Sequence, residues 1–202
     1  MSLWLDPHPL MLASKSEIRR ALLVNAGIAV EVAPADIDER AVEARLRPAG
    51  PLAAAKVLSQ EKARAISEKM KGRVVLGADQ VLALGDKRFT KPVDRVTARA
   101  QIGVLRGRTH ELYSGIALMR DGKELFEHVA VARLTMRDFS DAFLDAYLDA
   151  AGASVTQSVG GYQLENYGVH LFETIEGDHF TILGLPLLPL LDGLRHAGLL
   201  AR

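Results

Sequence analysis

The feature that most constrains the fold is the run from Val74 to Leu84, which is apolar almost throughout. Turn signals stand on both sides of it, Lys71-Gly72 before and Gly85-Asp86 after. A near-continuous apolar run of this length is typical of a strand covered on both faces, as the central strands of α/β sheets are. We therefore predict an α/β protein with a mixed, twisted sheet, flanking helices and two lobes around a central cleft.

Asp79 and Gln80 stand in the middle of this apolar run. Burying a carboxylate in such apolar surroundings costs roughly several kcal/mol of hydration free energy, unless a cation or hydrogen-bond donors replace the lost water. One interpretation is a structural aspartate that caps a helix or holds a turn. The other is an aspartate at the mouth of a cleft that binds a metal ion or activates water.

The bulk composition excludes several classes of protein. The chain has 202 residues, enough for a single domain with two lobes over residues 1–202. Its 25 basic and 25 acidic residues cancel, so we expect no binding to nucleic acid or to an anionic membrane surface. Cysteine is absent and no segment resembles an export signal, which favours a cytoplasmic protein.

A possible anion-binding turn lies near the start of the chain. The apolar strand Leu10–Ala13 runs into Ser14-Lys15-Ser16, and a helix is expected from Glu17 to Ala26. A strand, a short turn and a helix in this order direct free backbone N–H groups at an anion, here with Arg19 nearby. The alternative is that the serines only cap the helix while the basic side chains are solvated.

Two lysines lie close in sequence to the central strand. Pro51 begins a helix expected to run to Lys69, with Leu52, Ala55, Leu58 and Ile66 on its apolar stripe. Lys62 falls on that stripe, where it either extends past apolar surface to water or meets an anion. Beyond the strand, Lys91 follows a hairpin turn expected at Gly85-Asp86-Lys87.

The remaining elements are predicted from periodicity and turn residues. They are a strand at 30–33, a helix at 97–105, a hairpin of 109–120 with 124–137 across Asp121-Gly122, a helix capped by Ser140-Asp141, strands at 169–175 and 181–183, and a last helix ending at His196. The conformation of the polar connection 40–50 cannot be assigned from the sequence.

The chemistry that recurs along the chain is a cation next to a carboxylate. Glu39 and Asp79 offer oxygen ligands for a hard divalent ion, while Lys15, Arg19, Lys62 and Lys91 could contact phosphates. The six histidines are dispersed without metal-ligand spacing. This set of side chains fits metal-assisted hydrolysis of a phosphoanhydride.

At these residues the chain resembles the Maf family of nucleoside triphosphate pyrophosphatases, which are also called septum-formation inhibitor proteins. The matching motifs, in chain order, are Leu12-Ala13-Ser14-Lys15-Ser16, Arg19-Arg20, Asp38-Glu39, Glu61-Lys62-Ala63, Gly77-Ala78-Asp79-Gln80, Lys91-Pro92, Gly107-Arg108-Thr109-His110, Gly161-Tyr162 and Gly184-Leu185-Pro186-Leu187. The resemblance runs nearly from end to end of the chain.

The resemblance implies a role for each site residue. Asp79, Lys62 and Lys91 would be catalytic, with Asp79 and Glu39 as ligands of Mg²⁺ or Mn²⁺. Ser14, Lys15, Arg19, Gln80 and Glu165 would contact a nucleoside triphosphate. A non-catalytic nucleotide-binding regulator of cell division is the competing interpretation, and the resemblance leaves a homodimer open.

The chain departs from the commoner family pattern at three places. Glu17 and Ile18 replace a proline and an arginine in the first motif, Gln80 replaces a threonine, and Glu165 stands where many members have a glycine-rich segment. These departures resemble the subgroup associated with 7-methylguanosine triphosphate.

Overall fold

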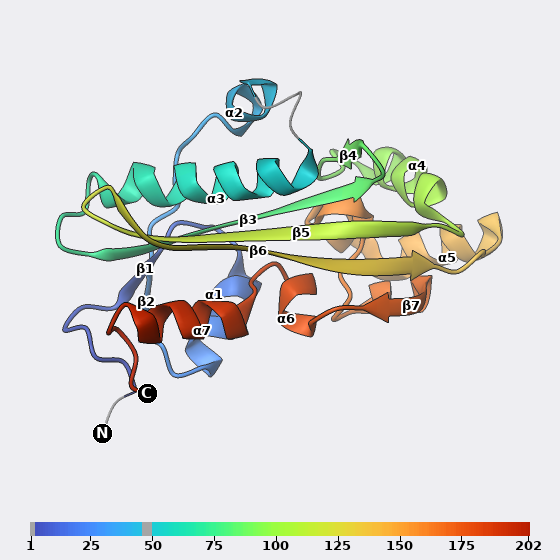
Figure 1. The fold of residues 1–202 in the computed structure, drawn as a ribbon. Coiled ribbons are helices and arrows are strands. Elements are labelled where there is room, and N and C mark those ends of the chain that lie inside the picture. Colours follow the sequence, from blue (N-terminus) through green and yellow to red (C-terminus); the bar gives the residue numbers. More distant parts are fainter. Residues whose placement is uncertain (1–2, 46–49) are drawn as a thin grey trace. The chain divides into compact units, whose positions relative to one another are not determined.

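The computed structural model describes residues 3–45 and 50–202 and confirms an α/β protein with a mixed seven-stranded sheet and flanking helices (Figure 1). The elements in chain order are β1 (Leu10–Leu12), α1 (Glu17–Asn25), β2 (Val30–Val32), α2 (Glu39–Arg45), α3 (Pro51–Ser67), β3 (Val74–Leu84), β4 (Lys87–Phe89), α4 (Arg95–Leu105), β5 (Thr109–Arg120), β6 (Lys123–Met136), α5 (Asp141–Ala151), the 3-10 helices η1 (Gly152–Thr156), η2 (Val159–Gly161) and η3 (Tyr167–Leu171), β7 (Phe172–Glu176), α6 (His179–Ile182) and α7 (Leu187–His196). Within the described residues, no helix is long and apolar enough to span a bilayer.

The predicted central strand is β3, and its bounds agree with the apolar run. The strand order is β2-β1-β3-β5-β6-β7, with β4 also paired to β3. β1 runs parallel to β2 and β3, whereas β4 is antiparallel to β3 and β7 is antiparallel to β6. The turn between β5 and β6 is Asp121-Gly122, and both residues have positive φ, as the two-residue hairpin turn predicted there requires.

The chain forms two compact units. Unit 1 comprises residues 1–80, 114–130 and 179–202, and unit 2 comprises residues 81–113 and 131–178. The chain passes from one unit to the other within β3, β5 and β6, and again between β7 and α6. A single domain whose two lobes share a cleft stays a prediction.

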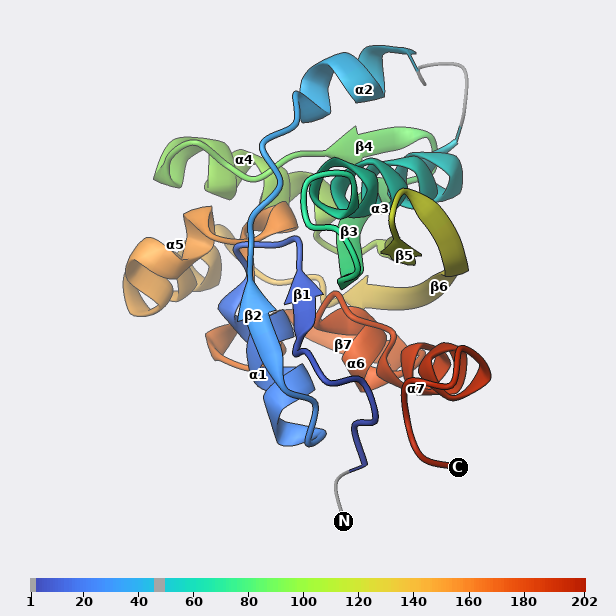
Figure 2. The ribbon, with the colours of Figure 1, turned by 90° about the vertical axis from the view of Figure 1, so that its left-hand side faces the viewer.

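Unit 1 has three layers, with α3 on one face of its strands and α1 and α7 on the other (Figures 1 and 2). Side chains alternate between the two faces along each strand. On β5, Ile116 and Leu118 belong to the large core with α7, while Ala117 and Met119 pack beside Ala63 of α3. The alternation along β3 likewise places Val75 beside Ile66 of α3 and Leu76 in the large core.

Two glycines let α3 lie unusually close to the sheet. A Cβ atom on Gly77 of β3 would lie 2.0 Å from the backbone oxygen of Ser59, and one on Gly115 of β5 would lie 2.3 Å from that of Ala55. Any side chain at either position would therefore push the helix away. The close approach brings the helix face that carries Lys62 against β3.

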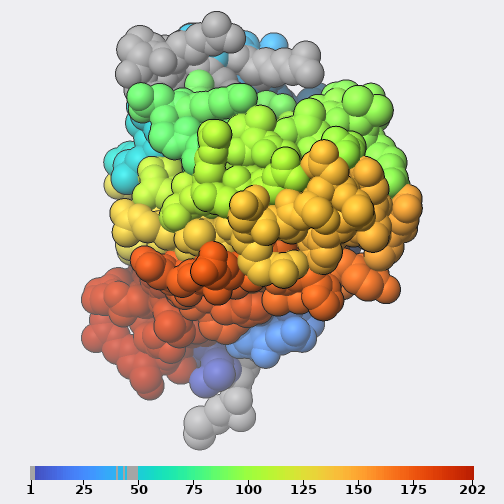
Figure 3. Space-filling view, turned by 90° about the vertical axis from the view of Figure 1, so that its right-hand side faces the viewer, coloured from blue at the N-terminus to red at the C-terminus, as the bar shows by residue number. Residues whose placement is uncertain are grey.

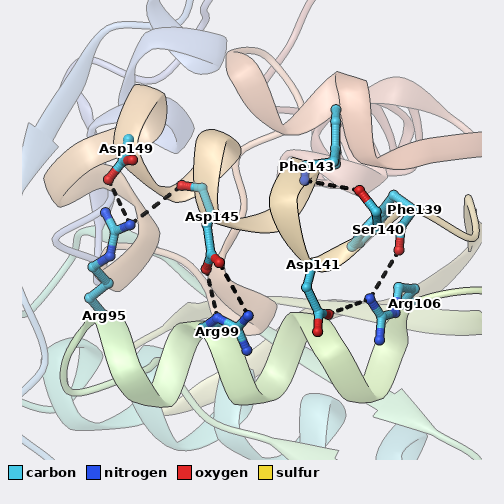
Figure 4. Close-up of polar contacts among 9 residues, drawn as sticks. All are labelled: Arg95, Arg99, Arg106, Phe139, Ser140, Asp141, Phe143, Asp145 and Asp149. Atoms are coloured by element: carbon cyan, nitrogen blue, oxygen red, sulfur yellow. Dashed lines mark hydrogen bonds and ion pairs between the residues drawn. The ribbon is translucent and has the colours of Figure 1, made fainter.

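In unit 2, ion pairs connect α4 to α5, which lie side by side in the space-filling view (Figure 3). Two arginines of α4, and Arg106 directly after its last residue, contact aspartates of α5: Arg95 with Asp149, Arg99 with Asp145, and Arg106 with Asp141, each at 2.7 Å (Figure 4). These side chains are largely solvated, so the pairs fix the register of the two helices more than they stabilise the fold.

An aromatic cluster forms the interior of unit 2. His110, which is fully buried, makes a 2.7 Å hydrogen bond between Nε2 and the hydroxyl of Tyr162, and both rings pack near Phe172. Tyr162 follows Gly160 and Gly161, which both have φ of 79°. Burial lowers the pKa of His110 to about 4, so the ring is neutral at pH 7.

The buried histidine predicts a loss of stability in mild acid. Unfolding restores an ordinary histidine pKa near 6.5, so between about pH 6.5 and pH 4 the unfolded chain binds the extra proton. The contribution of buried His110 to the free energy of unfolding is therefore fully present above pH 6.5. It is lost as the pH falls, so the free energy of unfolding should decrease by about 2 kcal/mol between pH 7 and pH 5. Urea titrations at pH 7 and pH 5 measure this difference in unfolding free energy. In the variant His110→Gln, the difference between the two pH values should be smaller by about the same 2 kcal/mol.

Two sequence-based element assignments were wrong in whole or in part, and a third segment had no assignment. Residues 181–183 were expected to form a strand, but the chain forms the short helix α6 there. The strand expected at 169–175 is a 3-10 helix as far as Leu171, and only Phe172–Glu176 pairs with β6. Short apolar runs do not distinguish a strand from a buried helical turn. Within the connection 40–50, α2 extends to Arg45, while residues 46–49 lie outside the described residues.

Candidate active site

The ammonium of Lys62 joins two carboxylates in unit 1. Its Nζ lies 2.5 Å from Oδ1 of Asp79 and 2.8 Å from Oε1 of Glu39. The side chains of Lys62 and Asp79 are 12% and 11% exposed, and that of Glu39 is 53% exposed. Of the two interpretations of Lys62, extension to water or contact with an anion, the structure therefore shows the contact with an anion. Leu52, expected on the same apolar stripe, is instead 50% exposed.

The geometry of the site follows from the alternation along β3. Asp79 is two residues beyond Gly77 and so points to the α3 face, where the small residues Ala63 and Ser59 allow the helix to lie close. Lys62 lies on the helix face that packs there. Two separate sequence features, the glycine in the strand and the lysine in the apolar stripe, thus produce one contact.

Gln80 points to the opposite face of the sheet. Its Nε2 donates to Oγ of Ser114 at 3.0 Å and to the backbone oxygens of Thr181 and Ile182 at 3.2 and 3.0 Å. Ser114 is fully buried and donates in turn to Thr181 O at 2.7 Å. These bonds hold α6 to β3, so any contact of Gln80 with a base would have to use its Oε1.

Arg19 is the cation that supports this arrangement from α1. Its Nη1 donates to Ala78 O at 2.8 Å and to Oγ of Ser14 at 3.1 Å, and its Nε donates to Gly184 O at 2.8 Å. Burial lowers the pKa of Arg19, and Coulombic attraction from Asp79 and Glu39 opposes that shift. An arginine stays protonated even so. Its charge, together with that of Lys62, offsets the two carboxylates.

The turn after β1 is organised by its serines. Oγ of Ser16 accepts from Arg19 N at 3.4 Å and caps α1, and Oγ of Ser14 accepts from Ser16 N at 3.3 Å. The capping interpretation is therefore confirmed for Ser16. Ser14 is 9% exposed and Lys15 is exposed. Contact of either residue with phosphate stays a prediction.

The other two predicted residues belong to unit 2. Lys91 is exposed and follows β4 by two residues, while Glu165 is exposed in the loop before η3. The structure thus brings together Glu39, Lys62, Asp79 and Arg19 within unit 1. The roles assigned to Lys91 and Glu165 stay predictions.

Asp79 and Glu39 could hold a divalent ion together with a substrate. Among the described residues, no group of three or more His, Cys, Asp or Glu side chains is placed to enclose a metal ion. Mg²⁺ commonly uses only one or two carboxylates and takes its other ligands from water and substrate phosphates. Asp79 and Glu39 already share the ammonium of Lys62, so an ion held by these two carboxylates stays a prediction.

The sequence did not reveal that Ser114 accepts a hydrogen bond from Gln80 or that Gly184 accepts one from Arg19. Ser114 belongs to none of the motifs and carries no signal of its own in the sequence. Gly184 belongs to the last motif, and a Cβ atom there would lie 3.2 Å from Nη2 of Arg19. Only the folded chain shows that both residues support the segment around Asp79.

The fold and the site define a class of protein: an α/β protein whose buried strand aspartate is paired to a helix lysine within a cluster of balanced charges. A profile described as "Maf-like protein" matches residues 9–197, and the chain belongs to this family.

Curated relatives match the chain along its whole length. It is 55% identical over 201 residues to a nucleoside triphosphate pyrophosphatase of Rhodopseudomonas palustris, with 100% of both chains covered. It is 51% identical over 191 residues to a 7-methyl-GTP pyrophosphatase of Mesorhizobium japonicum, covering 94% of this chain and 96% of that protein. Among solved structures, a HAM1 protein from Coxiella burnetii aligns with TM-score 0.45 and 16% identity, covering 64% of this chain and 73% of the other.

Proposed function

We propose that this chain is a metal-dependent nucleoside triphosphate pyrophosphatase. It hydrolyses the bond between the α and β phosphates, so that one triphosphate and one water give a nucleoside monophosphate and pyrophosphate. The observation that carries the proposal is the Lys62 ammonium at 2.5 Å from Asp79 and 2.8 Å from Glu39. Full-length relatives named as such pyrophosphatases support it.

Each residue then has a chemical role. Asp79 accepts the proton of the water that attacks phosphorus, because the contact with Lys62 holds its carboxylate at a fixed position. Lys62, Lys91 and Arg19 stabilise phosphate oxygens as negative charge builds on them, and Ser14 donates a hydrogen bond. Asp79 and Glu39 would hold a Mg²⁺ or Mn²⁺ ion, which would neutralise phosphate charge and acidify water.

We further propose that the preferred base is guanine, in particular its 7-methylated form. Guanine presents N1–H and an exocyclic amine side by side, and one carboxylate can accept both hydrogen bonds. Uracil and thymine offer a single N3–H between two oxygens that repel a carboxylate. Glu165 is the acid that we assign to this contact. The name of one relative, a 7-methyl-GTP pyrophosphatase, supports the preference for the methylated base.

A nucleotide panel tests both the activity and the base preference. Purified protein with Mg²⁺ or Mn²⁺ should release pyrophosphate from 7-methyl-GTP and GTP with a higher kcat/KM than from dTTP or UTP. A preference for either pyrimidine nucleotide over every guanine nucleotide would refute the base pocket but keep the pyrophosphatase. Nucleotide binding without any release of pyrophosphate would favour the non-catalytic regulator.

Replacing Glu165 by glutamine isolates the pocket from the chemistry. The amide keeps the shape of the side chain but loses one acceptor and the charge, so the guanine preference should narrow by about tenfold. Turnover of the best substrate should change far less than in an Asp79 variant. Glu173→Gln, a change at another exposed glutamate of unit 2, is the control and should leave the preference unchanged.

A further inference from the structure

The ammonium of Lys62 contacts the same two carboxylates that the proposed function assigns to a divalent ion. Its Nζ donates to Oδ1 of Asp79 at 2.5 Å and forms an ion pair with Oε1 of Glu39 at 2.8 Å. Three elements of unit 1 supply these side chains, since α2 carries Glu39, α3 carries Lys62 and β3 carries Asp79. The fold thus places a cation of the chain itself between the two oxygens.

A divalent ion and the ammonium compete for these oxygens. Mg²⁺ binds a carboxylate oxygen at about 2.0–2.1 Å. An ion bound to Oδ1 of Asp79 would therefore lie at most about 5 Å from the position that Nζ of Lys62 occupies, whatever its direction. Two positive charges at that separation repel each other, and most strongly where little water screens them. Binding of the ion therefore favours departure of the ammonium.

Burial makes this competition strongest at Asp79. The side chains of Asp79 and Lys62 are 11% and 12% exposed, so the protein excludes most of the water that would weaken the repulsion. The side chain of Glu39 is 53% exposed, and an ion pair that water reaches contributes little stability. Glu39 can therefore exchange its partner easily, whereas Lys62 leaves Asp79 at a cost unless another anion receives its charge.

We propose that Lys62 keeps divalent metal from Asp79 and Glu39 until a nucleoside triphosphate binds. Lys62 then leaves both carboxylates to the ion that arrives with the substrate, and its ammonium contacts a phosphate oxygen instead. This inference rests on the proposed pyrophosphatase function, which supplies the phosphate. Because each ligand removes the obstacle to the other, metal and nucleotide bind cooperatively, by the same factor in either order.

Titration of the full chain with Mn²⁺, without nucleotide and with the free ion measured by electron paramagnetic resonance, tests the proposal. Lys62→Met should bind Mn²⁺ about tenfold or more tightly than the wild type, because a like charge close to the ion is removed. Lys62→Met/Asp79→Asn should lose this gain, because a carboxylate ligand is removed as well. Lys56→Met, the same change at the partly exposed lysine of α3 that pairs with Glu127, is the control and should bind Mn²⁺ as the wild type does.

The ammonium itself is followed in the wild type by ¹⁵N NMR of the lysine side chains, where Lys62→Arg identifies the signal of Lys62. At a Mg²⁺ concentration that saturates turnover, this signal should shift little with Mg²⁺ alone. It should shift strongly when Mg²⁺ is added together with a triphosphate whose α and β phosphorus atoms are joined by a non-hydrolysable methylene bridge, because the ammonium then changes its partner.

Equal Mn²⁺ affinity of Lys62→Met and the wild type, or a signal of Lys62 that shifts fully with Mg²⁺ alone, overturns the proposal and leaves the pyrophosphatase in place. Absence of pyrophosphate release from every nucleotide of the panel is a separate result, which overturns the proposed function and this inference with it. Circular dichroism shows whether Lys62→Met is folded, and if it is not, the NMR measurement in the wild type decides alone.

Discussion

Asp79→Asn is expected to lower the turnover of nucleoside triphosphates by about 10²–10⁴-fold, because an amide can neither accept the proton of the attacking water nor bind a metal ion as a carboxylate does. The fold should persist. Lys62 keeps Glu39 at 2.8 Å as a charged partner, so the substitution leaves no cation unpaired. Steady-state pyrophosphate release and thermal melting measure the two effects separately.

The control for Asp79→Asn is Asp138→Asn, the same change at an exposed aspartate of unit 2. It should leave both turnover and melting temperature near the wild-type values. Near-normal turnover in Asp79→Asn would remove Asp79 from the chemistry. The aspartate would then be the structural residue that its place in an apolar strand also allows.

Lys62→Met is expected to reduce both activity and stability. Methionine keeps most of the apolar stem but removes the ammonium, so phosphate stabilisation in the transition state is lost and kcat/KM should fall by about 10²–10³-fold. Asp79, whose side chain is 11% exposed, loses its closest positive charge. Breaking a buried pair from one side costs about 3 kcal/mol of unfolding free energy, which urea titration measures.

A matched control lies on the same helix. Lys56 of α3 pairs with Glu127 at 2.7 Å, but both side chains are substantially exposed, so Lys56→Met should have little effect on activity or stability. The double variant Lys62→Met/Asp79→Asn should regain most of the stability that Lys62→Met loses, because the isolated carboxylate is gone. If the double variant is no more stable than Lys62→Met, the instability does not arise from an unpaired Asp79.

The local pattern of the sequence was sufficient for most of the elements. The apolar run of β3, the Asp-Gly turn between β5 and β6 and the proline that begins α3 each carry their signal within a few neighbouring residues. Such signals reflect backbone conformation and the alternation of buried positions, which the chain encodes locally. The errors occurred where burial and local propensity disagree, as in the short helix α6.

The sequence by itself also determined the residue types of the site and the family they resemble. A carboxylate in an apolar strand and a lysine in an apolar stripe are each unfavourable without a partner, so both were identifiable in advance. Only the tertiary structure decided that they are each other's partners. Gly77 and Gly115 let α3 approach the sheet, and this long-range packing brings Lys62 to Asp79. Only folding, too, decided that Gln80 bonds to Ser114 and to α6, because these partners come from segments far apart in the chain.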